Sequence, residues 1–169
     1  AERLQDVGIK AITIHGRTRP QRPRIPADWT LIGEVKNNQR MHIPVFGNGD
    51  VMDPQAAKHF KDNYGVDGLM VARGSYGNPW IFRDIKHYLD TGEINPVPDI
   101  HERIRISTIQ LERSVEWKGE RRGVVELRKH WGNYFKGYPN FKPFRQHLMQ
   151  VEEMDAVKKI LEEIREYYY

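Results

Sequence analysis

Cysteine is absent from this 169-residue sequence. Without thiols the chain can form no disulfide and no thiolate metal site, and it carries no cysteine nucleophile or acid. Long apolar runs are also missing, since none approaches the roughly 20 residues that a membrane-spanning helix needs. No signal-peptide pattern is present. With hydrophobic residues at 38% of the sequence, these absences are typical of a rather polar, soluble protein, and we expect a cytoplasmic location.

Positive charge is distributed unevenly along the chain. The formal net charge is +4, but residues 118–145 contain eight lysines and arginines against two glutamates, a local charge of +6. A basic segment that also carries histidine and aromatic residues indicates a nucleic-acid backbone as the partner. A solvated helix face is the alternative, because most charge runs have that role.

Two stretches organise the first half of the chain: IPVFGNGD (43–50) and DGLMVARGSYGNPW (67–80). Each begins as a short apolar run without helical spacing and then breaks into glycine and polar residues. This pattern is typical of a buried parallel strand that ends in a tight loop. Between the two stretches, Asp53 is a predicted N-cap and Pro54 the first residue of a helix.

The same patterns predict three βα units. The predicted strands are residues 9–14, 43–46 and 68–72; the predicted helices are residues 28–36, 54–63, and one that Asn78-Pro79 caps. In the first of these helices the apolar stripe is Leu31, Ile32 and Val35. Residues 20–26, rich in proline and arginine, are predicted to be irregular.

The second half of the chain contains no strand candidate. Residues 91–98 form a predicted linker with two prolines and a glycine. Asp99 and Glu102 form a predicted capping box for the next helix, and further helices are predicted at residues 120–135, 143–150 and 152–167. This half is predicted to be a small helical bundle.

Two glycine loops in succession after parallel strands indicate a candidate phosphate site. Glycine lets backbone N–H groups approach an anion, and (β/α)8 barrels form a phosphate site after their last two strands. Arg73 would add a cation that binds phosphate in two places. Ordinary βα turns, in which glycine only avoids strain, are the alternative.

Other candidate residues have two interpretations each. His15 follows a strand and is either a hydrogen-bond donor to a cofactor or substrate, or a strand-end histidine; Arg17 and Arg19 would lie at the same rim. Asn48 and Asp50 either bind polar edges of a cofactor or stabilise the turn, and the turn is favoured for Asp50. No metal-binding pattern is present.

In the basic segment, residues 128–130 (RKH) and Arg145 are predicted RNA-phosphate contacts, with a solvated face as the alternative. Tyr134, Tyr138 and Phe141 are predicted to pack in the core or in loops rather than to stack on bases.

Five motifs together carry a resemblance: HGRTR (15–19), IPVFGNGD (43–50), DGLMVARG (67–74), GNPWIF (77–82) and RKH (128–130). Their order and spacing resemble the tRNA-dihydrouridine synthase family along essentially the whole chain, most closely the bacterial branch once called nitrogen-regulation-like proteins. Those enzymes are (β/α)8 TIM barrels that hold FMN, followed by a helical domain that helps to bind tRNA. They reduce the C5–C6 double bond of selected uridines, with NADPH as the reductant of the flavin.

The resemblance implies roles for particular residues. It implies FMN binding, chiefly at the phosphate, by His15, Asn48, Gly49, Asp50, Ala72 and Arg73. It implies tRNA contacts by Arg17, Arg128, Lys129, His130 and Arg145. It also implies an α/β partial barrel at residues 1–90, a linker at 91–98 and a tRNA-binding helical domain at 99–169.

The family's proton-donating cysteine and flavin-contacting lysine belong to the first half of the barrel. The three strands predicted here would be the sixth to eighth, so the resemblance implies a C-terminal half that lacks its N-terminal partner. Residues 1–8, which look like the tail of a helix, agree with that expectation. We expect such a fragment to be inactive alone, because reduction needs a hydride and a positioned proton donor. We also expect it to self-associate through exposed sheet edges.

Two other functions stay open at this point. The helical half alone is an RNA-binding module in one of them, with the βα units as a scaffold. In the other, the chain is part of a different FMN barrel, such as a dihydroorotate or dihydropyrimidine dehydrogenase, although small substrates give no reason for a basic helical tail.

Overall fold

The computed structural model describes residues 1–21 and 25–169, which divide into two compact units. Unit 1 consists of Ala1–Ser75 and Pro79–Asn95, and unit 2 consists of Tyr76–Asn78 and Pro96–Tyr169. Part of the segment predicted to be irregular, residues 22–24, lies outside the described residues.

Unit 1 is built on a parallel sheet of three strands in the order β1-β2-β3. The strands are β1 (Ile12–His15), β2 (Val45–Asn48) and β3 (Gly68–Met70). The register pairs His15 with Asn48 and Asn48 with Met70, so the carboxyl ends of all three strands are level at one edge. The prediction of an α/β unit with parallel strands is confirmed.

The first two strands begin two to three residues later than predicted. Pro44 lacks an N–H and therefore cannot donate to a ladder. Its carbonyl accepts a hydrogen bond from the Ile12 N–H at 3.0 Å, and the paired residues start with Ile12 opposite Val45. At their other ends both strands run further than predicted, so His15 and Asn48, which pair with each other, are the last residues of β1 and β2 rather than loop residues.

The helices of unit 1 are α1 (Glu2–Asp6), α2 (Thr30–Lys36), α3 (Pro54–Tyr64) and α4 (Ile81–Thr91), with a short 3-10 helix η1 (Arg73–Ser75) after β3. The cap of α3 is confirmed, because the Asp53 side chain accepts a hydrogen bond from the Ala56 N–H at 2.7 Å. The cap predicted for α4 is wrong. Trp80, whose side chain is buried, stands at its N-cap with helical angles and no side-chain cap bond, and the helix begins at Ile81.

Trp29 is the centre of the core of unit 1. Its ring stacks on Phe60 with centroids 4.1 Å apart. It belongs to a cluster of buried residues: Trp29, Ile32, Val51, Ala57, Val66, Ile81 and Ile85. A side chain at Gly47 would collide with the Trp29 ring, which leaves glycine there as the residue that fits. The predicted inward stripe of α2 is wrong at Leu31, whose side chain is 64% exposed.

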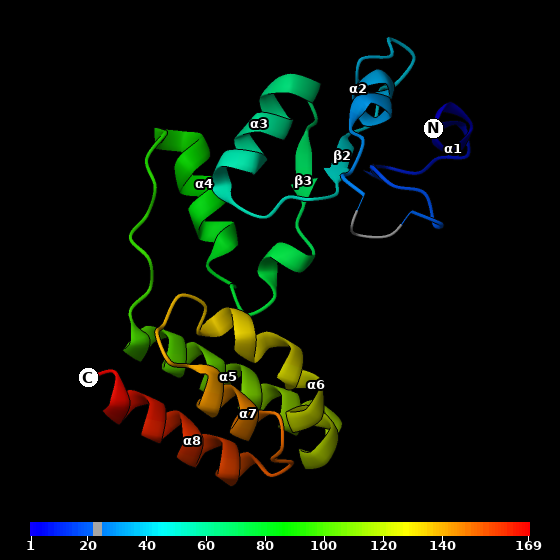
Figure 1. Cartoon of the computed structure of the whole chain (residues 1–169). Helices are drawn as coiled ribbons and strands as arrows, with labels where there is room; N and C mark the ends of the chain where they lie inside the picture. Colours follow the sequence, from blue (N-terminus) through cyan, green and yellow to red (C-terminus); the bar gives the residue numbers. More distant parts are fainter. Residues whose placement is uncertain (22–24) are drawn as a thin grey trace. The chain divides into compact units, whose positions relative to one another are not determined.

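Unit 2 consists of helices together with residues 76–78. The helices are α5 (Ile100–Lys118), α6 (Glu120–Tyr134), α7 (Lys142–Leu148) and α8 (Met154–Tyr167), and Figure 1 shows them packed together. Asp99 caps α5 by accepting a hydrogen bond from the Glu102 N–H at 2.8 Å, as the sequence predicts. The core residues predicted for α6 and α8 are buried: Val124, Leu127, Trp131, Phe135, Val157, Ile160, Leu161 and Ile164. Among the described helices, none has the length and apolar character needed to cross a membrane.

Candidate functional site

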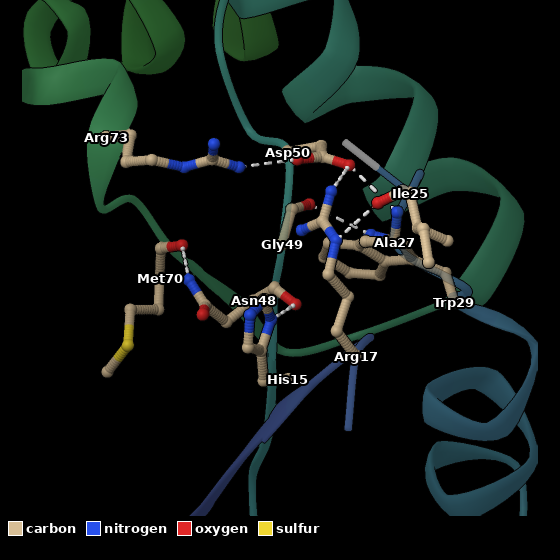
Figure 2. Close-up of polar contacts among 10 residues, drawn as sticks. All are labelled: His15, Arg17, Ile25, Ala27, Trp29, Asn48, Gly49, Asp50, Met70 and Arg73. Carbon is tan, nitrogen blue, oxygen red and sulfur yellow. Dashed lines mark hydrogen bonds and ion pairs between the residues drawn. The ribbon is translucent and has the colours of Figure 1, made fainter. Parts of the chain in front are cut away.

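The carboxyl ends of the three strands in unit 1 are joined by side-chain hydrogen bonds (Figure 2). The Asn48 side-chain amide donates to the Met70 carbonyl at 2.6 Å, which ties β2 to β3. The His15 Nδ1 atom lies 3.0 Å from the Asn48 carbonyl oxygen, which ties β1 to β2. These contacts hold the edge at which the next loop begins.

That loop turns at Gly49 and Asp50, which have φ values of 129° and 55°. Asp tolerates the left-handed region better than most residues. A Cβ at Gly49 would lie 2.7 Å from the Ala27 Cβ and 3.1 Å from the His15 Nδ1, so the close approach of three segments requires glycine. The Gly49 carbonyl accepts a hydrogen bond from the Trp29 indole at 3.0 Å, which anchors the turn to the core.

The Asp50 carboxylate is the polar centre of the site. Its Oδ2 atom accepts hydrogen bonds from the Arg17 guanidinium and, at 2.8 Å, from the Ala27 N–H. Its Oδ1 atom accepts one from the Arg73 Nη2 at 3.0 Å. The carboxylate thus joins the segment after β1, the segment before α2 and the start of η1.

The two arginines keep Asp50 ionised. Burial disfavours the charged carboxylate, but the hydrogen bonds from Arg17 and Ala27 and the charges of Arg17 and Arg73 outweigh it, so the pKa of Asp50 is lowered from its ordinary value. The two cations differ in exposure. The Arg17 side chain is 5% exposed, whereas that of Arg73 is 43% exposed and lies open to a ligand.

A cavity of about 110 Å³ lies at this edge of the sheet. Its lining includes these predicted site residues: His15, Arg17, Asn48, Gly49, Asp50, Ala72 and Arg73. Two arginines and one aspartate give the lining a net positive charge. The cavity therefore favours an anion, and it lies at the sheet edge where open parallel sheets bind ligands.

The structure corrects one interpretation of this site and adds two residues to it. A turn-stabilising role was favoured for Asp50, but its described bonds go to residues 23 and 33 positions away. Sequence reasoning missed the contribution of Ala27 and Trp29. No motif marks Ala27. The one signal for Trp29 is the glycine at position 47 of β2, where a side chain would collide with the Trp29 ring.

The predicted RNA contacts lie in unit 2, where Arg128 and His130 bind other parts of the chain. The Arg128 Nη2 donates to the Val151 carbonyl at 3.1 Å. His130 Nδ1 accepts a hydrogen bond from the Gly77 N–H at 3.0 Å. Burial, and then the charge of Lys129 and that of Lys118, lowers the pKa of His130, so its ring is neutral at pH 7.

Other cations of the basic segment are paired. Lys118 and Arg122 donate to Glu126 at 2.5 and 2.8 Å, and these hydrogen bonds lower the pKa of Glu126 to about 2. Lys129 lies over the Tyr76 ring, 5.3 Å from its centroid. No ion pair is formed within the described part of the chain by four exposed cations of this segment: Lys129, Lys136, Lys142 and Arg145.

The prediction that Tyr134 and Phe141 pack in the core is confirmed, since both are buried. Burial raises the pKa of Tyr134 to about 12, and its hydroxyl donates to the Gln110 side chain at 2.6 Å. Within residues 1–21 and 25–169, no three His, Asp or Glu side chains are placed to hold a metal ion.

The described fold and site are those of an α/β unit with parallel strands and a cavity lined by two arginines at their carboxyl edge. The family model described as dihydrouridine synthase (Dus) matches residues 1–167. The chain belongs to the dihydrouridine synthase family, as its motifs predict.

Three relatives illustrate the match. A probable tRNA-dihydrouridine synthase of Rickettsia conorii is 41% identical over 99% of this chain and 49% of that protein. The tRNA-dihydrouridine synthase B of Pseudomonas putida is 40% identical over 92% of this chain and 46% of its own length. That of Escherichia coli K12 is 37% identical over 96% and 50%. The chain spans about half the length of the curated relatives that it matches.

Proposed function

We propose that this chain is the C-terminal half of a flavin-dependent tRNA-dihydrouridine synthase, an oxidoreductase that reduces uridines of tRNA with NADPH. Family membership over 167 residues supports the activity. The observation that carries the cofactor is the arginine-lined cavity at the strand ends. In this proposal the three strands are the last three of a (β/α)8 barrel, at residues 1–90, and residues 99–169 are the tRNA-binding domain.

The donor set of the cavity supports binding of the FMN phosphate. A guanidinium has five N–H donors, and the described ion pair of Arg73 with Asp50 uses one nitrogen. The remaining donors suit a phosphate, to which arginine binds in two places. A phosphate would be repelled by Asp50 itself, so we assign Asp50 to holding Arg73 and Arg17 in place rather than to direct contact.

The other predicted cofactor residues shape the site. Gly49 permits the close approach of the turn to the strand ends, and His15 and Asn48 fix those ends by hydrogen bonds. Ala72 lies between β3 and η1, Arg73 is the first residue of η1, and both line the cavity. When bound, FMN would supply the hydride for reduction of the uridine. In this proposal the proton donor is the family's cysteine, which this chain lacks and which the first half of the barrel would supply.

Unit 2 is the proposed tRNA-binding part, because it contains the basic segment. Among the proposed phosphate contacts, Lys129 and Arg145 are exposed and form no ion pair with a described residue. Contact by Arg17 would need its buried side chain to leave Asp50, and His130 binds the Gly77 N–H. Because tRNA is the proposed substrate, we place the enzyme in the cytoplasm.

The cofactor assignment is tested by titrating the chain with FMN and with riboflavin, which lacks the phosphate, and by following flavin fluorescence. Arg73→Ala removes a charge-assisted contact and should weaken FMN binding by about tenfold to a hundredfold, with little effect on riboflavin. Arg83→Ala is the matched control, since Arg83 also pairs with an aspartate in unit 1, at 2.8 Å, but lies outside the cavity lining.

Equal loss in both variants, or equal loss of FMN and riboflavin, would contradict a phosphate site at Arg73. Binding of FMN without any binding of tRNA would instead favour another class of FMN barrel.

A further inference from the structure

A second hollow, of about 530 Å³, lies in unit 2 and is lined largely by arginines. Arg121, Arg122 and Arg128 come from α6, and Glu152 comes from the segment before α8. Three guanidinium groups against one carboxylate give the lining a net positive charge. Such a surface attracts a phosphate group rather than a neutral ligand.

Arg128 has unused donor capacity at this hollow. Its Nη2 donates to the Val151 carbonyl at 3.1 Å. Its Nε atom is buried and has no hydrogen-bond partner among the described residues. A ligand cannot reach the buried Nε atom, so a phosphate at this hollow would accept hydrogen bonds from the Nη groups of the guanidinium.

Glu152 occupies this cationic surface with its own two-oxygen anion. One carboxylate oxygen accepts a hydrogen bond from the Arg121 Nε at 2.7 Å, and the other lies 3.8 Å from the Arg128 Nη2. The hydrogen bond from Arg121, with the charges of Arg121 and Arg128, lowers the pKa of Glu152, which is therefore ionised at pH 7. Arg122, which also lines the hollow, donates a hydrogen bond to Glu126 at 2.8 Å.

We propose that this hollow binds one phosphate of an RNA backbone, and that Glu152 is an internal competitor which that phosphate displaces from Arg121 and Arg128. The inference rests on the proposed tRNA substrate and deepens it, because it names a contact and a residue that weakens it. The non-bridging oxygens of a phosphodiester resemble the two carboxylate oxygens in charge and spacing. Exposed ion pairs contribute little to stability, so the exchange leaves the fold intact.

The competition gives Glu152 a definite effect on affinity. An RNA phosphate must displace the Glu152 carboxylate before it can bind. This competition lowers the affinity of the hollow for RNA and for any other polyanion. Removal of the carboxylate therefore tightens RNA binding, whereas removal of Arg121 weakens it. Both effects depend on the same contact, so they are coupled rather than additive.

The experiment measures binding of unmodified tRNA to the chain at about 150 mM salt, where the Debye length is about 8 Å. Glu152→Gln should tighten binding about threefold to tenfold. Arg121→Gln should weaken it by a similar factor and reduce the slope of log affinity against log salt by about one. In the double variant, the gain from Glu152→Gln should be largely lost.

Glu162→Gln is the matched control. It removes the same charge from α8 and also breaks an ion pair with an arginine, Arg165 at 2.9 Å, away from the hollow. Equal tightening by Glu152→Gln and Glu162→Gln would overturn the inference, because it would show only a long-range effect of net charge. Thermal unfolding of each variant separates a loss of binding from a loss of fold.

The outcomes distinguish the two proposals. Binding of tRNA that is unaffected by Glu152→Gln and by Arg121→Gln overturns this inference and leaves the proposed function standing. Absence of tRNA binding in the parent and in all variants overturns both the inference and the tRNA-binding role of unit 2.

Discussion

At the scale of single residues, Asp50 has the largest structural role in unit 1. One carboxylate satisfies a buried guanidinium, an exposed guanidinium and a backbone N–H, which come from three different segments. A buried cation is tolerated only when it is paired and hydrogen-bonded. Loss of the Asp50 charge should therefore destabilise the fold mainly by leaving the buried Arg17 guanidinium without its anion.

Asp50→Asn should lower the free energy of unfolding at pH 7 by about 1–3 kcal/mol, because Arg17 loses its anion while the side-chain shape is kept. The folded-state pKa of Asp50 lies below its ordinary value of 3.8. Its contribution is therefore complete above that value and is lost as the pH falls toward the lowered pKa. Urea unfolding should show that parent and variant converge in acid. An equal difference at pH 7 and in acid would contradict this role.

Gly77 is a second residue whose identity is fixed by its surroundings, here in unit 2. Its φ is +60°, and a Cβ would collide with the His130 carbonyl oxygen and lie 2.8 Å from the Tyr134 nitrogen. Gly77→Ala should cost about 1–3 kcal/mol more than Gly137→Ala, which has a φ of +93° but nothing within 4 Å of its Cβ. Thermal unfolding of the two variants measures the difference, and equal shifts in Tm would show that the collision is relieved.

At the scale of elements, the helix caps are the contacts that local sequence specifies best. Asp99→Ala should destabilise unit 2 by about 1 kcal/mol, since the Glu102 N–H loses its acceptor at the start of α5. Asp90→Ala, at an exposed position late in α4, is the control and should have a smaller effect. Hydrogen exchange of the first turn of α5 checks the result, and unchanged protection in Asp99→Ala would contradict it.

Local signals explain which elements were predictable from the sequence. Asp53-Pro54 and Asp99 act through neighbouring backbone groups, so α3 and α5 begin where the sequence predicts. The starts of β1 and β2 depend instead on the partner strand, because pairing begins with Ile12 opposite Val45, directly after Pro44. A single strand carries no sign of that limit, and the start of α4 at Ile81 likewise has no side-chain cap that would mark it in the sequence.

The candidate site shows the same division. The glycine loops and Arg73 are visible in the sequence because they follow apolar runs. The pairing of Arg17 with Asp50 joins residues 33 positions apart, and nothing in either neighbourhood predicts it. The charge count of residues 118–145 overestimated the unpaired cations, because Glu152 lies outside that window and pairs with Arg121.

At the scale of the whole molecule, the described sheet has two edge strands, β1 and β3. Unpaired strand edges are templates for another chain. We expect the chain to self-associate through β1, and Thr13→Lys, which adds a charge at an exposed position of that strand, should shift the equilibrium toward monomer. Sedimentation velocity over a range of concentrations measures this. A parent chain that sediments as a monomer throughout would contradict the expectation.

The division into units limits how the gene for this chain can be divided by recombination. Residues 76–78 belong to unit 2, although the residues on both sides of them belong to unit 1. The Gly77 N–H that binds His130 is encoded some fifty codons upstream of that histidine. A gene segment that begins at residue 96 would encode four helices but not this partner. Neither unit is a contiguous block of sequence, so recombination cannot move one between genes without cutting into the other.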